Sequence, residues 1–185
     1  MGLDIHIGTN NKVYSAEYYD EEHKYFNKHS LSRTFCKFMG RQHMVSHEPE
    51  LDQIGRITGV DISPIYEMES YPEEEGLETA DSEEEKLKIL KKAEEDKAKS
   101  QGNLDQVLRT VTELIEKLNY IDNLPSLLLP TDFDSLGNEK YFSAFQVDKG
   151  EGYIGNNFGQ DLRNFKRFLE FAKTKGTTTV WFNYE

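Results

Sequence analysis

The chain of 185 residues contains a single cysteine and no long apolar run. One cysteine excludes an intrachain disulfide, so nothing in the sequence indicates an oxidising compartment. No apolar stretch approaches the ~20 residues that a membrane helix needs. The first residues, MGLDIHIG, lack the basic and apolar regions of a secretion signal. We therefore expect a cytoplasmic protein with no membrane association.

Basic residues are also scarce. The chain has 22 Lys and Arg against 34 Asp and Glu, a formal net charge of −12. This balance disfavours binding to nucleic acid or to an anionic membrane. Hydrophobic residues make up only 36% of the chain, but aromatic residues reach 12%. Because each aromatic side chain buries a large area, we expect a core built on aromatics.

Both ends of the chain have the character of strands. Apolar and polar residues alternate over 3–7, and 177–184 is rich in β-branched and aromatic residues. We expect one small antiparallel or mixed sheet that includes both termini, with helices packed on it, so the fold class is α+β. Two further strands are predicted at 13–19, returning as a β-hairpin, and at 141–148. Helices are predicted at 30–43, 50–57 and 160–173.

The middle of the chain differs in composition from both ends. Residues 67–99 hold 13 acidic residues against six lysines, a net charge of −7. Within 81–120, apolar stripes at helical spacing predict two helices, which we interpret as an antiparallel helical hairpin. We therefore expect an α+β core made of 1–70 and 125–185, interrupted by an acidic linker and hairpin insertion at 71–124.

Asp4 and His6 are the first candidates for chemistry. On a strand they share one face, about 6 to 7 Å apart. That spacing suits a catalytic pair, in which a carboxylate orients a general base, or a shared metal ion. Two alternatives remain open: both residues are solvated edge-strand positions, or Asp4 pairs with a basic residue such as Arg33.

His43 and His47 have the i, i+4 spacing that places two imidazoles on one side of a helix. With Glu48 or Glu50 nearby, they could bind zinc or another transition metal. The pair lacks the internal glutamate of the HExxH motif, and the alternative is a set of exposed polar residues near a helix end. No cofactor is predicted, although this pair could bind a divalent metal.

Two further segments are candidate binding sites. Arg33, Lys37 and Arg41 recur every four residues and form a basic stripe, which could bind phosphate or an acidic partner, or pair with the protein's own carboxylates. The glycine-rich loop at 150–159 joins the predicted strand 141–148 to the last helix, a position where phosphate-binding loops occur. Its candidate binding residues are Gly152, Gly155 and Asn156, and the alternative is a set of tight turns.

Three segments of the chain are MGLDIHI, SLSRTFCKFM and GQDLRNFKRFLEFA. In these segments the chain resembles a loose set of uncharacterised bacterial and phage proteins, which begin MGLD and carry a similar Leu-Ser-Arg-Thr-Phe stretch. The likeness covers about the first 65 and the last 45 residues and leaves the predicted hairpin uncovered. The resemblance implies no activity, cofactor or catalytic residue. It supports treating the hairpin as an insertion and favours an accessory or mobile-element role.

Two hypotheses follow for function. The first is an interaction protein that binds another protein, or a second copy of itself, through the acidic hairpin or the basic helix faces. The second is a small metal-dependent hydrolase with its site around Asp4 and His6. Because the sequence contains no strong catalytic constellation, we favour the first.

Overall fold

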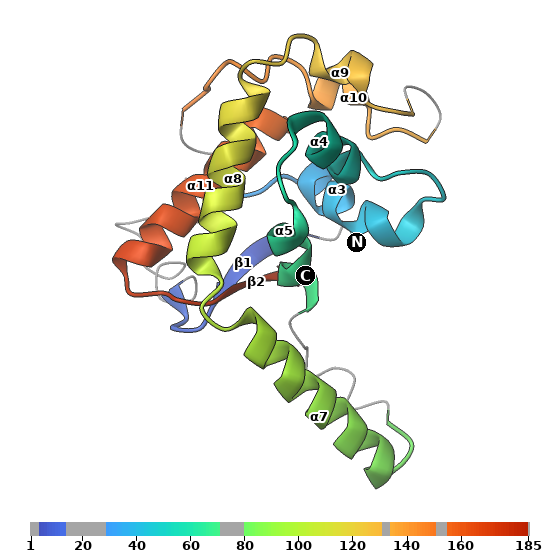
Figure 1. Ribbon diagram of the computed structural model, residues 1–185, viewed down its shortest axis with the longest axis vertical. Helices are drawn as coiled ribbons and strands as arrows, with labels where there is room; N and C mark the ends of the chain where they lie inside the picture. Colours follow the sequence, from blue (N-terminus) through green and yellow to red (C-terminus); the bar gives the residue numbers. More distant parts are fainter. Residues whose placement is uncertain (1–3, 14–28, 71–79, 131–133, 151–154, 185) are drawn as a thin grey trace.

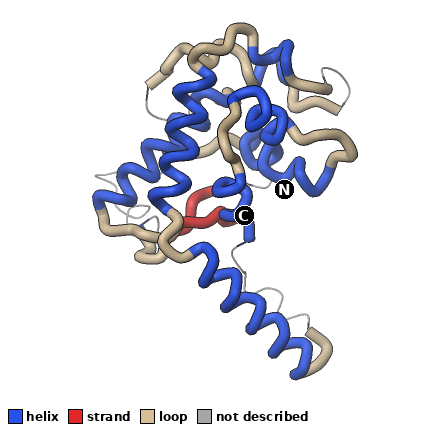
Figure 2. The backbone as a smooth tube through the Cα atoms, viewed as in Figure 1, coloured by secondary structure: helices blue, strands red, loops and turns tan. Residues whose placement is uncertain are grey.

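The computed structural model describes residues 4–13, 29–70, 80–130, 134–150 and 155–184. Figure 1 shows a body of helices beside one small sheet, with a long helix directed away from it, and Figure 2 shows that helices predominate. The elements in chain order are β1 (Ile5–Thr9), α3 (Arg33–Met44), α4 (Glu50–Thr58), α5 (Ser63–Glu67), η1 (Met68–Ser70), α7 (Glu83–Ser100), α8 (Leu104–Leu118), α9 (Leu124–Leu127), α10 (Asn138–Tyr141), α11 (Phe158–Thr174) and β2 (Val180–Tyr184).

The sheet joins the two ends of the chain, as predicted. Strands β1 and β2 are antiparallel, with Ile7 opposite Phe182 and Thr9 opposite Val180. Because side chains alternate across a strand, Ile5 and Ile7 share one face with Val180 and Phe182 of β2, and these four residues are buried. The α+β class is therefore confirmed. The returning strand predicted at 13–19 falls almost entirely outside the described residues.

Helix α11 lies at the centre of the core. Its first half is buried on every side, because α8 packs along it and the aromatic residues of α3 and α10 surround its N-terminal end. The aromatic core predicted from composition is present. Neighbouring rings have their centroids less than 6.5 Å apart and mostly meet edge to face; the rings are those of Phe35, Phe38, Tyr141, Phe142 and Phe158.

The two helices predicted to form a hairpin are present but do not pair. The apolar stripe of α8 packs on α11, α5 and α4 and is mostly buried, with Leu108 and Ile115 only partly covered. Helix α7 instead points away from the body (Figure 1), and its Leu87 and Leu90 are 66% and 45% exposed. Helix α8 therefore belongs to the core, because its wider and more continuous apolar stripe packs against α11.

The corner between α7 and α8 is attached to β2. The Asn103 side-chain amide donates to the Val180 carbonyl and accepts from the Val180 N–H, both at 2.9 Å. The N–H of Gly102 donates to Thr179 Oγ1 at 3.0 Å, and the N–H of Leu104 donates to the Thr178 carbonyl at 3.1 Å. These bonds fix the start of α8 against the sheet, so α7 leaves the body at this point.

The strand predicted at 141–148 is wrong. Tyr141 ends α10, and 142–147 forms turns in which the N–H of Val147 donates to the Ala144 carbonyl. The buried residues here are Tyr141, Phe142 and Phe145, which do not follow the alternation of a strand. Ala144 has φ 50, a left-handed conformation that ends any extended pairing.

Candidate functional site

Asp4 forms an exposed ion pair with Arg33, which was one of the alternatives left open by the sequence. The Arg33 Nε–H donates to Asp4 Oδ1 at 2.9 Å, and the two side chains are 67% and 57% exposed. Such surface pairs contribute little to stability. The pair joins the Asp4 side chain, just before β1, to the first residue of α3.

His6 takes a different partner, on the polar face of the sheet. Its Nε2 lies 3.2 Å from the Asn183 amide nitrogen, and Asn183 Oδ1 accepts from the Trp181 indole N–H at 2.8 Å. The indole lies directly over Gly8, where a Cβ atom would stand 2.4 Å from Trp181 Nε1. Glycine is therefore required at position 8 for close approach of the ring. Asp4 and His6 do not share a partner among the described residues.

The basic stripe of α3 is dispersed among different environments. Arg33 is paired with Asp4, Lys37 is exposed, and Arg41 is buried. The predicted stripe does not present three free cations, because the body of the protein takes up two of them.

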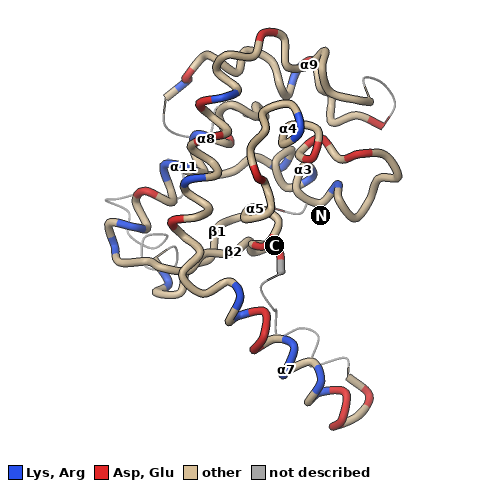
Figure 3. Tube along the Cα trace, in the orientation of Figure 1, with Lys and Arg blue, Asp and Glu red and all other residues tan. Residues whose placement is uncertain are grey.

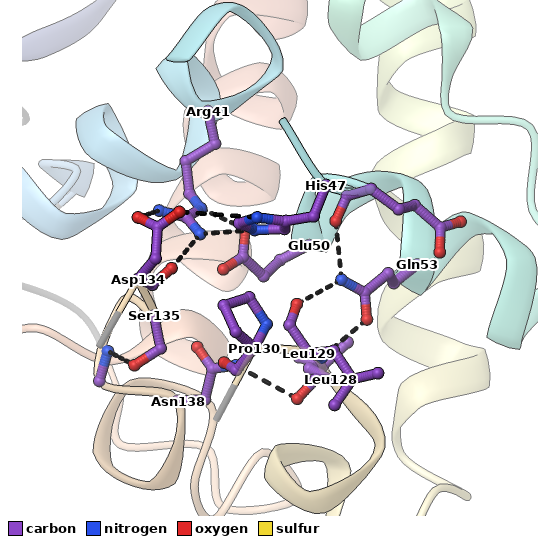
Figure 4. A network of polar contacts seen from close by, with 12 residues as sticks. Arg41, His47, Glu50, Gln53, Leu128, Leu129, Pro130, Asp134, Ser135 and Asn138 are labelled. Carbon is purple, nitrogen blue, oxygen red and sulfur yellow. Dashed lines mark hydrogen bonds and ion pairs between the residues drawn. The ribbon is translucent and has the colours of Figure 1, made fainter. Parts of the chain in front are cut away.

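Arg41 is the centre of a polar network that holds α3, α4 and the segment after α9 together (Figure 4). Its guanidinium forms an ion pair with Glu50, and the two side chains are only 8% and 0% exposed. It also donates to the Asp134 carbonyl at 2.6 Å. Removal of one member of a buried pair leaves an uncompensated charge, so these residues are interdependent.

His47 belongs to the same network. The Arg41 guanidinium lies 3.1 Å from His47 Nε2, and His47 Nδ1 lies 3.5 Å from Asp134 Oδ2. A guanidinium has only donors, so Nε2 accepts and the ring proton belongs on Nδ1, facing Asp134. The lone pair that a metal or a substrate proton would need is therefore occupied by Arg41.

The same region is fixed by two side-chain amides. Gln53 donates from Nε2 to the carbonyls of Glu48 and Leu129, at 2.8 and 2.5 Å, and accepts from the N–H of Leu129 at 2.8 Å. Asn138 donates to the Pro130 carbonyl at 3.0 Å. These bonds satisfy backbone groups of a segment that has no regular secondary structure, so they replace a sheet or helix as its support.

His43 is separated from His47 because α3 ends at Met44, and Val45 already has an extended conformation. His43 is exposed and lies 3.4 Å from the Glu69 carboxylate, which also accepts from the Tyr184 hydroxyl at 2.6 Å. The two imidazoles predicted to share a metal thus have different partners. Among the described residues, no group of three or more His, Cys, Asp or Glu side chains is placed to hold a metal ion.

The glycine-rich loop is attached to α11 by an arginine. Arg167 donates to both carboxylate oxygens of Asp148 at 2.9 Å and to the Gly150 carbonyl at 2.8 Å. The N–H of Gly150 holds the pKa of Asp148 below its usual range, with Arg167 contributing. Gly155 has φ 102 and Asn156 is exposed, whereas Gly152 lies outside the described residues.

One buried carboxylate is not among the residues predicted from the sequence. Asp161, in the first turn of α11, is 1% exposed. It accepts from the Ser32 N–H at 2.8 Å, from the Ser32 hydroxyl at 2.6 Å and from the Tyr141 hydroxyl at 2.9 Å. Burial raises its pKa to about 7 despite these three donors. Ser32 is also the N-cap of α3, since its hydroxyl accepts from the Phe35 N–H at 3.2 Å.

A local signal for this cluster exists in part. Ser32 precedes a helical stripe and is a typical capping residue, but an aspartate in the first turn of a helix is usually explained by the helix dipole alone. Only the packing of α3 on α11 shows that the N-cap of α3 and the first turn of α11 meet in the core.

Comparisons of the chain with protein-family models, curated proteins and solved structures found no match. None of the described helices is both long enough and apolar enough to cross a membrane.

Proposed function

We propose that this chain is a protein-interaction module and that α7 is the element that docks on the partner. One observation carries the proposal: α7 extends away from the body and exposes Leu87 and Leu90, while α8 and α11 bury their apolar stripes (Figure 1). Two leucines three residues apart lie on one side of a helix and are the kind of anchors that a hydrophobic groove receives.

Helix α7 has the means to remain helical without packing on the core. Its N-cap, Ser82, accepts from the Glu85 N–H at 3.2 Å. Ion pairs at i, i+3 and i, i+4 follow its length, and Figure 3 shows acidic and basic residues alternating in blocks along it. Each such pair adds ~0.2–0.5 kcal/mol to an isolated helix. Within α7, only Ser100 at the C-terminal end is buried against the described residues.

The charges of α7 indicate the chemistry of the partner. The leucines are flanked by four lysines within seven residues, at positions 86, 88, 91 and 92. A partner surface that suits this segment is an apolar groove with carboxylates on its rim. The basic stripe of α3 is a weaker candidate, because Arg41 is buried in an ion pair and the apolar residues of α3 are buried in the core. An accessory role, as favoured by the resemblance, is compatible with such a module.

The test is a comparison of the full chain with the double variant Leu87→Glu/Leu90→Glu. A partner isolated with the wild-type chain is purified, and its binary affinity is measured by isothermal titration calorimetry. We expect a loss of at least about tenfold, because two apolar anchors of ~1.5 kcal/mol or more each are replaced by charges.

The matched control is Leu127→Glu, since Leu127 is 48% exposed but lies on α9. Circular dichroism checks that both variants keep their helix content. Equal affinity of the wild-type chain and the α7 variant would refute α7 as the docking element.

The second function considered from the sequence, a metal-dependent hydrolase, would require the Asp4–Arg33 pair to open so that Asp4 could join His6. Elemental analysis of the purified chain tests it: a stoichiometric metal that is lost in His6→Ala would favour the hydrolase.

A further inference from the structure

A surface pocket of about 330 Å³ lies between the C-terminal end of α8, the start of α9 and the turns after α10. This volume is at the lower end of the ~300–1,000 Å³ typical of ligand sites. In Figure 1 these elements lie at the end of the body opposite α7. Its apolar lining includes the buried residues Leu124, Phe142 and Phe145, and its polar lining includes Asn123, Glu139 and Gln146.

The walls of the pocket depend on an unusual backbone. Asn123 and Ala144, both lining residues, have left-handed conformations with φ of 54 and 50. For a residue with a side chain this conformation costs free energy, most clearly for alanine, and such costs concentrate at binding sites. Cross-bonds hold the two walls in place: Gln146 Nε2 donates to the Ile121 carbonyl at 2.6 Å, and Asn157 Nδ2 donates to the Ser143 carbonyl at 3.0 Å.

The electrostatics of the pocket favour a cation. Within the part of the chain that the structure describes, Glu139 is the only ionisable residue that lines it, and no Lys, Arg or His does. Among the described residues, the Glu139 carboxylate has no hydrogen bond or ion pair, so it is available to a ligand. Ile121 follows the C-cap of α8, Asn119, by two residues, so the negative end of that helix dipole adds to the same potential.

We propose that this pocket binds an organic cation, an ammonium or guanidinium group on an apolar stem. The cation pairs with Glu139, and the stem packs against the partly exposed side chains of Ile121 and Pro125, above the buried floor that Leu124, Phe142 and Phe145 form. The ligand chemistry is shared by a free amine and by a lysine or arginine side chain of a peptide. This proposal is independent of α7 and of the function proposed above.

The experiment is a titration of the ¹⁵N-labelled full chain followed by amide chemical shifts. Benzylammonium is the cationic probe, benzyl alcohol the neutral probe and benzoate the anionic probe. We expect saturable shifts at Ala144 and Gln146 with benzylammonium, weaker binding of benzyl alcohol, and none of benzoate. Acetyl-Leu-Lys-Leu-amide tests whether the natural cation is a lysine side chain of a peptide. If this peptide binds more tightly than benzylammonium, the pocket takes a peptide side chain. If it binds more weakly, the pocket takes a free amine.

The variant Glu139→Gln keeps the shape of the side chain and removes its charge. We expect benzylammonium to bind this variant about fivefold more weakly, which corresponds to the upper end of the free energies of exposed ion pairs. The affinity for benzyl alcohol should not change. Glu113→Gln, an exposed change on α8 outside the pocket, is the matched control. Equal shifts with all three probes, no saturable shift at Ala144 and Gln146, or an unchanged affinity of Glu139→Gln would each overturn the proposal.

Discussion

Substitution of Asp161 by Asn should change how the stability of this protein depends on pH. Three donors, two from Ser32 and one from Tyr141, stabilise the charged carboxylate, while burial of the side chain favours the neutral acid. Burial outweighs the donors, and the pKa rises from 3.8 to about 7. Asn has nearly the shape of Asp and keeps an acceptor for the Ser32 N–H, but it does not titrate.

The sign of the effect follows from proton binding. Between pH 4 and 7 the folded protein holds a proton on Asp161 that the unfolded chain has released, so the free energy of unfolding falls as the pH rises. The stabilisation is complete below about pH 4 and is lost as the pH passes about 7. At ~1.4 kcal/mol per pKa unit, a shift of this size corresponds to about 4 kcal/mol, an order-of-magnitude figure.

The assay is urea unfolding of the wild-type chain and of Asp161→Asn at several pH values from 4.5 to 8, followed by the fluorescence of the single tryptophan, Trp181. We expect the wild-type chain to lose stability relative to the variant as the pH increases. Asp148→Asn is the control. The pKa of Asp148 is lowered from 3.8, so its contribution to stability is lost only as the pH falls below about 4, and the difference between the wild-type chain and this variant should stay nearly constant from pH 4.5 to 8. If the wild-type chain instead gained stability over Asp161→Asn with rising pH, the three donors would outweigh burial and our reasoning would be refuted.

Three further predictions concern stability and reactivity. In urea unfolding, Glu50→Gln should destabilise the fold by about 3–5 kcal/mol, because it leaves the buried Arg41 cation unpaired. Glu48→Gln, which breaks the exposed pair with Arg56, should cost under about 1 kcal/mol. Similar costs for the two variants would contradict the argument from burial. Ala144→Gly should raise the free energy of unfolding by about 0.5–1 kcal/mol, because a residue with φ 50 is least strained when it is glycine. Ala144→Val should lower the free energy of unfolding. A glycine variant less stable than the valine variant would exclude a strained backbone at this position. The Cys36 thiol should react with Ellman's reagent far more slowly in the native protein than in urea. Burial raises the pKa of this thiol, and nearby acidic residues contribute to the increase. Equal rates in the two conditions would show that the thiol is accessible.

Several elements could be predicted from the sequence because their causes are local. Helix α4 was predicted at 50–57 and is observed at Glu50–Thr58, where Gly59 ends it in a left-handed conformation. Helix α11 was predicted from its stripe of apolar residues, all of which are buried. The terminal strands followed from alternation and from β-branched residues, since both patterns act over a few neighbouring positions.

The candidate site shows where local reasoning ends. Arg41 and His47 were predicted as parts of two separate sites, a basic stripe and a metal pair. The structure joins them through Glu50 and Asp134, residues up to 93 positions apart from Arg41. Pairing of this kind depends on which helices pack together, and no spacing along the chain encodes it.

The same distinction applies to the fold. By itself, the sequence determined that the chain would form two helices within 81–120 and strands at its two ends, because capping, propensity and periodicity are properties of short segments. Only the tertiary structure decided that α8 enters the core while α7 extends away from it, and that Asp161 meets Ser32 and Tyr141 away from water. The physical reason is that burial and desolvation depend on neighbours distant in sequence. Those neighbours are chosen by the fit of whole faces, here the stripe of α8 against α11.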